Sequence, residues 1–232
     1  MNFYLRQTSV SRRKCLILRC LNLITVEQGR AWLRAPFTMF IRSNLKPGTL
    51  LITCGLPGTW KTETSEEISK IRGFPILRTD LIRLEVLRDE DIFDEKVASS
   101  MSKRELVYNE MFRRAEELAQ KNKSVILDAT FVTQKLRRRA AEIAAKYDLT
   151  FVILQTHCSE DVSIARILGR TRENYESNAL TRQAYLNNKK RFEPIDLGDL
   201  KKRHPQLRVV LLTVDTEHDT PESWYFIRME ER

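Results

Sequence analysis

The stretch Thr49–Arg72 is the feature that most restricts how this chain of 232 residues can fold. It starts with an apolar run, Thr49–Cys54, which has the length and composition of a strand buried on both faces. A turn with glycines at Gly55 and Gly58 follows, and a helical pattern then runs from Lys61 to about Arg72. This order predicts a buried parallel strand that leads through a tight turn into a helix.

Apolar runs and helical patterns alternate along the rest of the chain. Further strands are expected at Phe74–Arg78, Ser124–Asp128, Leu149–Thr156 and Arg208–Val214. Helices are expected from near Asp80 and over about Glu95–Lys121, Thr133–Lys146, Glu160–Gly169, Leu180–Arg191 and Pro221–Met229. The run Arg137–Arg139 is expected on a solvated helix face. Because the strands are apolar on both faces, the pattern predicts an α/β fold with a parallel sheet flanked by helices on both sides.

Composition and charge exclude several classes of protein. Hydrophobic residues make up 42% and charged residues 31% of the chain, which excludes a disordered chain. No run of eighteen apolar residues occurs, so no membrane-spanning helix is expected. The net charge is +9, but residues 1–38 hold seven basic side chains and one acidic one. The remainder is nearly balanced and lacks the basic bias of a dedicated nucleic-acid binder.

The basic segment 1–38 is expected to be an extension that precedes a domain of residues 39–232. A signal peptide would need an unbroken apolar centre, and Arg19 interrupts the apolar run here. An amphipathic segment on a membrane surface stays open as an alternative, although the apolar run lacks a clean helical period. The jump in charge favours a third interpretation, in which the natural protein starts at Met39 and residues 1–38 are a start-site artefact.

The four cysteines do not predict a metal site. They stand at positions 15, 20, 54 and 158, with no CxxC pair and no pair of histidines at metal-ligand spacing. Cys54 and Cys158 fall beside apolar strand-like runs, where a free cysteine behaves as a small hydrophobic residue. The pattern favours a reduced, cytoplasmic protein.

The turn after the first strand reads Gly55-Leu-Pro-Gly-Thr-Trp-Lys-Thr62 and follows the phosphate-loop pattern GxxxxGK[ST]. Its glycines let backbone N–H groups point inward, and the helix that follows adds partial positive charge. Lys61 is expected to reach the outer phosphates and the Thr62 hydroxyl to bind Mg²⁺. The residues expected to bind ATP in this loop are Gly55, Pro57, Gly58, Thr59, Trp60, Lys61 and Thr62.

One position departs from this pattern, because Trp60 stands where the glycine before the lysine is expected. The tryptophan keeps its backbone N–H but adds bulk and restricts the backbone dihedral angles. Two interpretations follow. Either the ring points outward and stacks on the base or on a neighbouring ring, or the substitution has ended nucleotide binding.

Three further segments stand in a matching order: RTDLIR within Leu77–Arg83, VILDATF at Val125–Phe131, and RILGRTR at Arg166–Arg172. Together with the loop they resemble the P-loop kinases, in the group of ATP-binding kinases related to zeta toxin, gluconate kinase and the kinase domain of polynucleotide kinase. The resemblance implies a three-layer P-loop NTPase fold with a helical lid. It also implies an ATP- and Mg²⁺-dependent phosphotransferase that acts on a hydroxyl group of a small acceptor.

Asp80 and Arg83 follow the second expected strand. A carboxylate there can accept a proton from an attacking hydroxyl, and the resemblance implies that Asp80 is the general base. An N-cap of the next helix is the alternative. Arg83 lies one turn later on the same side, and the resemblance implies that it binds the acceptor or its phosphate. The alternative for Arg83 is an ordinary surface arginine.

Asp128 ends the third expected strand, where it could hold a Mg²⁺-bound water or the acceptor, with Thr130 assisting. Arg166 and Arg170 are four residues apart and share a helix face, and Arg172 follows in a polar stretch. Arginines on a mobile lid would neutralise the transferring phosphoryl group and exclude water. A solvated helix end is the alternative for each arginine.

Two other functions stay open at this point. A nucleotide-binding regulatory module without phosphoryl transfer is favoured by Trp60 alone. A 5′-hydroxyl nucleic-acid kinase is a second alternative, although the near-neutral body argues against long polymer substrates. The sequence does not choose the acceptor, because the residues of such a pocket come from distant parts of the chain.

Overall fold

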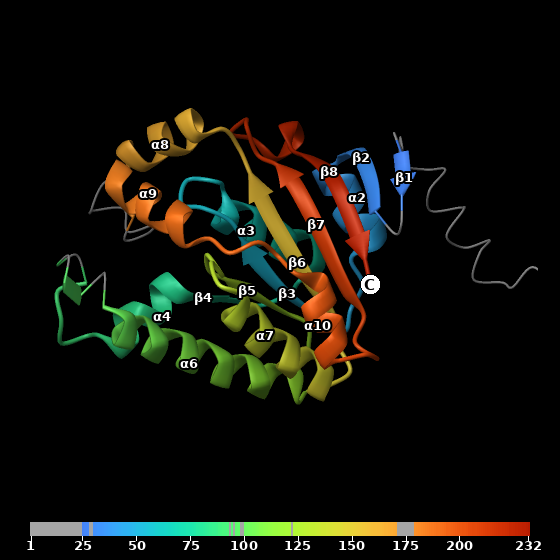
Figure 1. Ribbon diagram of the computed structural model, residues 1–232, viewed down its shortest axis with the longest axis horizontal. Helices are drawn as coiled ribbons and strands as arrows, with labels where there is room; N and C mark the ends of the chain where they lie inside the picture. The colour runs from blue at the N-terminus through green and yellow to red at the C-terminus, as the bar shows by residue number, and fades with distance from the viewer. Residues whose placement is uncertain are drawn as a thin grey trace, which may run out of the picture.

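The computed structural model describes residues 25–27, 30–92, 94, 96–97, 100–121, 123–170 and 179–232. The strands are β1 (Thr25–Glu27), β2 (Arg30–Pro36), β3 (Thr49–Cys54), β4 (Ile76–Arg78), β5 (Val125–Asp128), β6 (Thr150–His157), β7 (Val209–Asp215) and β8 (Tyr225–Glu231). The helices are α2 (Phe37–Asn44), α3 (Lys61–Arg72), α4 (Thr79–Val86), α6 (Met101–Ala119), α7 (Gln134–Lys146), α8 (Glu160–Leu168), α9 (Arg182–Arg191) and α10 (Leu197–Arg203). These elements form one sheet with helices around it (Figure 1).

Over the described residues, the sheet has eight strands in the order β1-β2-β8-β7-β6-β3-β5-β4. Its central part is parallel. The parallel pairs are β3 with β5, β3 with β6, β4 with β5, and β6 with β7. Alternate residues of β3 enter two separate apolar clusters. Leu50 and Ile52 pack with α4, α6, α7 and α10, whereas Leu51 packs with α2 and α3. Both faces of the sheet are therefore covered, and the expected three-layer α/β architecture is confirmed.

The other edge of the sheet is antiparallel, and there one expectation was wrong. The predicted helix Pro221–Met229 is a 3-10 turn, Pro221–Ser223, followed by strand β8. β8 pairs antiparallel with β7 and with β2. Its aromatic and β-branched residues suit a strand, and the pairing on both sides outweighs the local helical pattern.

Residues before Met39 take part in this edge. β2 joins the sheet, and the predicted domain boundary at Met39 lies inside α2. Phe37 is fully buried, with its ring 5.4 Å from the ring of Trp224 in an edge-on contact and 5.4 Å from that of Phe226 in a stacked one. The folded unit thus includes at least residues 30–38 in addition to those expected. That translation starts at Met39 stays a prediction.

Arg137 is the second correction, because the run Arg137–Arg139 was expected in solvent. The side chain of Arg137 is 0% exposed. Its guanidinium donates to the backbone carbonyls of Phe131, Val132, Glu193 and Pro194. Those carbonyls belong to two loops that lie outside helices and strands, so they need donors from elsewhere. The periodicity of α7 places residue 137 toward them.

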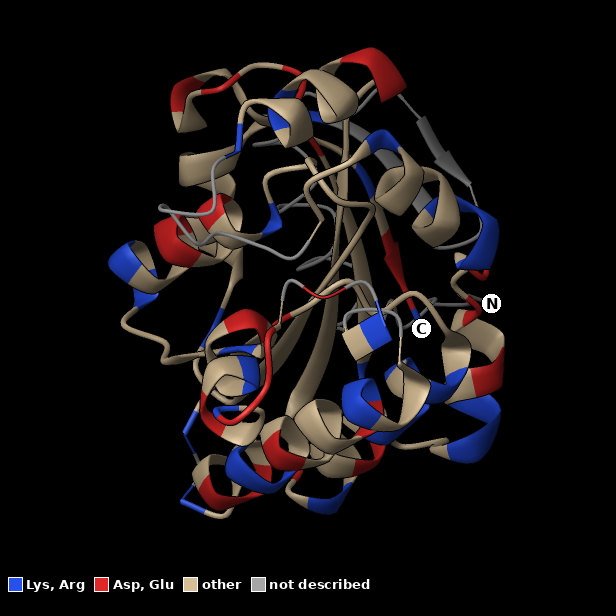
Figure 2. Cartoon of the chain, turned by 90° about the vertical axis from the view of Figure 1, so that its left-hand side faces the viewer, with Lys and Arg blue, Asp and Glu red and all other residues tan. Residues whose placement is uncertain are grey.

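The other expected elements are present with shifted ends. α6 begins at Met101 rather than near Glu95, since the Ser100 side chain accepts a hydrogen bond from Lys103 N and caps the helix there. Basic and acidic segments are interspersed over the helices in Figure 2. Among the helices that the structure describes, none is long and apolar enough to cross a membrane.

Candidate active site at the loop between β3 and α3

The backbone of the loop after β3 depends on its two glycines. A Cβ atom on Gly58 would lie 2.3 Å from the carbonyl oxygen of Ser163, and one on Gly55 would lie 2.5 Å from Thr156 Oγ1. Gly58 also has a φ of +80°, in the left-handed region that favours glycine. These close approaches bring the loop against α8 and the end of β6. Thr59, which is buried, fixes the turn by donating to the Leu56 carbonyl at 2.8 Å.

Trp60 adopts the backbone conformation that a glycine would adopt more easily. Its φ and ψ are 55° and 39°, which is the left-handed helical region. The chain passes directly from Trp60 into α3, whose first N–H groups have no acceptor within the helix and face the loop. The loop therefore keeps the path of a phosphate-binding turn despite the bulky residue.

The Trp60 ring is held in place by two partners, Arg166 and Asp219. The guanidinium of Arg166 lies over the ring, 4.6 Å from its centroid, and the indole Nε1 donates to Asp219 Oδ1 at 3.1 Å. Arg166 donates to the same Asp219 oxygen at 2.7 Å and to the Gly58 carbonyl at 3.2 Å. Of the two interpretations of Trp60, the outward-pointing ring fits this contact, with an arginine as the neighbour instead of an aromatic ring.

Lys61 is the first residue of α3 and extends back under the loop. Its Nζ donates to the Leu56 carbonyl at 2.7 Å. Burial lowers the pKa of Lys61 below its ordinary value, the negative charge of Asp128 opposes this shift, and the positive charge of Arg170 adds to it. A half-buried ammonium group at the N-terminus of a helix is suited to receive anionic oxygens.

Asp128 is the centre of a hydrogen-bonded group at the carboxyl ends of the strands. Thr62 Oγ1 donates to Asp128 Oδ2 at 2.7 Å, and Thr53 Oγ1 donates to Oδ1 at 3.1 Å. The parallel register explains the arrangement, because Ile52 pairs with Leu127 and Arg78 pairs with Asp128. A hydroxyl and a carboxylate that meet at this edge are oxygen ligands of the kind that Mg²⁺ prefers, so the residues present fit a Mg²⁺ ion. The structure describes no cluster of three or more histidine, cysteine, aspartate or glutamate side chains that could hold a metal.

Asp80 lies in the first turn of α4, immediately beyond β4. The N-cap position is occupied by Arg78, so the alternative of Asp80 as the cap is wrong. Burial and, next, the negative charge of Asp128 raise the pKa of Asp80 above its ordinary value, while Arg83 opposes the shift. A carboxyl group with a raised pKa at the end of a parallel strand is a candidate proton acceptor.

A cavity of about 960 Å³ joins these groups. The predicted site residues that line it are Pro57, Gly58, Trp60, Lys61, Thr62, Asp80, Arg83, Asp128, Thr130 and Arg170. Arg166 is instead tied to the outer side of the loop, and the buried Gly55 and Thr59 support the loop from behind. Arg172 lies outside the described residues.

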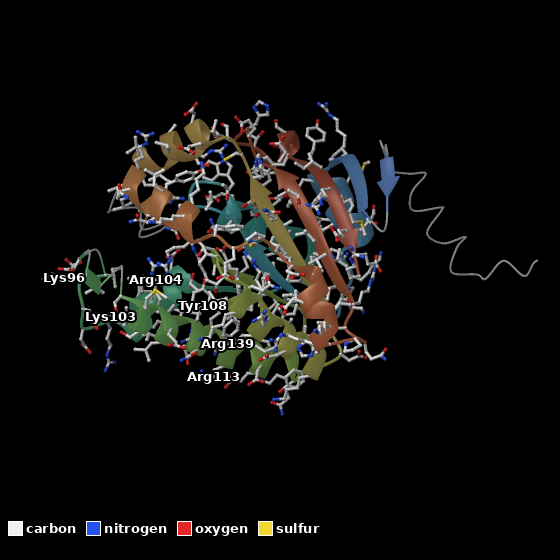
Figure 3. All side chains as sticks on the ribbon, in the orientation of Figure 1. Lys96, Lys103, Arg104, Tyr108, Arg113 and Arg139 are labelled. Carbon is white, nitrogen blue, oxygen red and sulfur yellow. The ribbon has the colours of Figure 1, made fainter. Side chains whose placement is uncertain are left out.

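Several lining residues were missed by sequence reasoning. Arg104 and Tyr108 on α6, Arg139 on α7 and Arg191 at the end of α9 all line the cavity. Figure 3 shows Arg104 and Tyr108 following each other along α6, with Arg139 on the neighbouring helix. The four-residue spacing of Arg104 and Tyr108 places both on one helix face and was a usable signal. The Tyr108 ring also packs edge-on against Phe131 at 5.6 Å.

Comparison with known families finds a match over more than half of the chain. A family model described as an AAA domain matches residues 50–195, which include the loop, Asp80, Asp128 and Arg170. A search of curated proteins finds no match.

Solved structures with the same fold are P-loop kinases and related proteins. A protein from Chloroflexus aurantiacus J-10-fl, classed by inference as a kinase, has a TM-score of 0.56 and 22% identity over 74% of this chain and 90% of that one. A gluconokinase from Sinorhizobium meliloti 1021 has a TM-score of 0.52 and 19% identity over 75% and 86% of the two chains. Kti12 from Chaetomium thermophilum, solved with ADP-AlF3, has a TM-score of 0.54 and 17% identity over 75% and 92%. At these identities the likeness establishes the P-loop kinase fold.

Proposed function

Since the chain belongs to the AAA domain family and has the fold of the P-loop kinases, we propose that it is an ATP-dependent phosphotransferase. In this proposal a hydroxyl group of a small acceptor takes the γ-phosphate of ATP. The observation that carries it is the meeting of Lys61, Thr62, Asp80 and Asp128 in one cavity. These residues come from three separate segments of the chain.

The phosphates of ATP occupy the loop 55–62 in this mechanism. Backbone N–H groups at the start of α3 and the half-buried Lys61 ammonium hold the phosphate oxygens. Thr62 and Asp128 would hold Mg²⁺, which neutralises charge on the phosphates when bound. Trp60 and Arg166 hold the outer side of the loop and act as positioning residues.

Asp80 acts as the general base. The acceptor oxygen attacks the γ-phosphorus, the bond to the bridging oxygen breaks, ADP leaves, and the hydroxyl proton passes to Asp80. The raised pKa of Asp80 makes its carboxylate a better proton acceptor than an exposed aspartate. Arg83 and Thr130 line the same cavity on the acceptor side.

The arginines after α8 stabilise the transferring group. Arg170 lines the cavity, and its positive charge acts on Lys61, which places it close to the phosphate end. Its Nη1 donates to the Ala179 carbonyl at 3.3 Å. We assign Arg172 to the same role by its place in the motif. Positive charge at this position offsets the negative charge on the equatorial oxygens of the transition state.

The test combines binding and transfer. Calorimetry with Mg²⁺–ATP measures binding, and labelled ATP with a panel of sugars, nucleosides, amino alcohols and short oligonucleotides measures transfer. Lys61→Ala should abolish both, whereas Asp80→Asn should keep ATP binding and lose transfer. Lys70→Ala is the matched control, because Lys70 is on the same helix and its side chain is 72% exposed. Retained transfer by Asp80→Asn would contradict the assigned base.

A regulatory nucleotide-binding module is the second candidate, and the left-handed Trp60 favours it. A tryptophan fixed by Arg166 and Asp219 stiffens the loop, which suits tight binding without turnover. Binding of Mg²⁺–ATP with no transfer to any acceptor of the panel would support the module. Failure of Mg²⁺–ATP to bind would exclude both candidates.

A further inference from the structure

Three arginines from three helices gather at the part of the cavity that the phosphate loop does not form. Arg83 comes from α4, Arg104 from α6 and Arg191 from the last turn of α9, and all three line the cavity. Arg191 Nη2 lies 2.8 Å from Met101 Sδ, so the end of α9 touches the start of α6. Residues ninety positions apart in the sequence are thereby brought together.

The three positive charges act on one another. Burial lowers the pKa of Arg104 below its ordinary value, and the next causes are the charges of Arg191 and Arg83. Like charges brought together in a partly desolvated site oppose folding unless an anion compensates for them. Of the described acidic residues that line the cavity, Glu105 lies 3.9 Å from Lys135 Nζ, and Asp80 is the proposed base.

Arg83 carries the clearest sign of a missing ligand. Its Nε and Nη1 atoms are buried and have no hydrogen-bond acceptor among the residues that the structure describes. Buried N–H groups without an acceptor are rare, because each one lost its hydrogen bond to water without gaining another. The guanidinium is a planar fork that matches the oxygens of a phosphate or a carboxylate.

We propose that Arg83, Arg104 and Arg191 bind an anionic group of the acceptor, so that the phosphorylated compound is a hydroxyl compound that carries its own phosphate or carboxylate. This inference rests on the proposed function. Asp80 and Arg83 are three residues apart on α4, or about 4.5 Å along the helix axis. The reacting hydroxyl and the anionic group therefore belong to one small molecule that spans from the base to the arginines.

The first experiment measures anion binding without turnover. The phosphate loop is filled with a non-hydrolysable ATP analogue and Mg²⁺, and inorganic phosphate is then titrated by calorimetry. Arg104→Gln and Arg191→Gln should each weaken phosphate binding by at least about ten-fold, since each removes a charge-assisted hydrogen bond. Arg113→Gln is the control, because Arg113 is exposed on the same helix α6 and pairs with Glu110 and Glu117 (Figure 3).

The second experiment separates the chemical classes of acceptor. Glycerol, glycerate and glycerol 3-phosphate present the same kind of hydroxyl group with no charge, a carboxylate or a phosphate. Glycerol should not compete with inorganic phosphate, and at least one of the two anions should. The anion that competes more strongly identifies the group that the arginines recognise. Competition by glycerol that equals that of both anions would overturn the proposal.

A stability measurement distinguishes a binding role from a structural one. Arg83→Gln should keep or raise the melting temperature, because it removes two buried N–H groups that have no acceptor, while it weakens phosphate binding. Unchanged phosphate affinity in Arg104→Gln and Arg191→Gln, or no phosphate binding by the wild type, would overturn the inference. If the ATP analogue fails to bind, the proposed function fails by itself, and the difference between wild type and variants still reports on the arginines.

Discussion

Replacing Arg137 by methionine should destabilise the protein more than any change on its exposed surface. The Arg137 guanidinium is fully buried and makes five hydrogen bonds, four of them to backbone carbonyls and one to Gln134 Oε1 at 3.1 Å. It also lies over the Phe192 ring at 5.1 Å. Methionine has a similar length and fills much of the space, but it offers no donor.

Two opposing effects decide how much stability Arg137→Met loses. Removing Arg137 recovers the cost of keeping a charged group out of water, and replacement of a buried ion pair by apolar residues is for this reason often neutral. Here the partners are backbone carbonyls, which no substitution removes, and four of them lose a donor at once. Removing one partner of a buried charged network costs about 3–5 kcal/mol. For a fold of this size that is a fall of about 6–20 °C in melting temperature, at about 2–4 °C per kcal/mol.

The assay is urea denaturation followed by circular dichroism, with thermal melts as a second measurement. Arg137→Lys should fall between wild type and Arg137→Met, because an ammonium group has three donors where the guanidinium has five. Arg113→Met is the control, and loss of its exposed ion pairs should leave the stability nearly unchanged. A loss below about 1 kcal/mol in Arg137→Met would refute the reasoning, since it would mean that the carbonyls find other donors.

Three further predictions follow from the same structure. Trp60→Gly removes left-handed backbone strain of about 1–2 kcal/mol and loses the contact with Arg166, which is worth about 0.5–2 kcal/mol. The free energy of unfolding, measured in urea, should therefore change by less than about 1.5 kcal/mol. A loss of stability above about 3 kcal/mol would contradict this balance. Because the folded-state pKa of Asp80 is raised, the stability that Asp80 contributes is fully present below its unfolded-state pKa and is lost as the pH rises through the folded-state value. Asp80→Asn should therefore unfold at higher urea than wild type at pH 7, with the difference vanishing toward pH 3, and a lower midpoint at pH 7 would argue against a desolvated carboxylate. A chain that starts at Met39 lacks β2 and Phe37, so it should be less stable than the full chain by about 3–5 kcal/mol in the same assay. Equal stability of the two chains would instead favour the start-site artefact.

The central strands could be predicted because their signal is local. The runs at β3, β5, β6 and β7 are apolar at almost every position, which follows from burial on both faces of a parallel sheet. The phosphate loop was equally predictable, since its glycines, lysine and threonine are contiguous. In both cases the residues that determine the structure are neighbours in the sequence.

The failures concern elements whose state is decided by distant partners. The segment expected as a helix, Pro221–Met229, begins with a proline, which is a common first residue of a helix. The strand β8 within it comes from pairing with β7 and β2. Arg137 stands in a run of three arginines, and nothing near it in the sequence marks the carbonyls of Glu193 and Pro194 as its acceptors. Arg104 and Arg191 meet only because α9 returns to the start of α6.

Residues that are neighbours in the sequence form one end of the candidate site, and residues from distant segments form the other end. The phosphate end is formed by a contiguous motif and the adjacent strand β5, whereas the proposed acceptor end is assembled from α4, α6 and α9. Arg137 connects them, because it bonds the loop that follows Asp128 to the residues that directly follow Arg191. If this connection sets the position of Arg191, Arg137→Lys should weaken phosphate binding at the arginines more than it weakens binding of the ATP analogue. Equal weakening of both would mean that Arg137 stabilises the fold without setting the distance between the two ends.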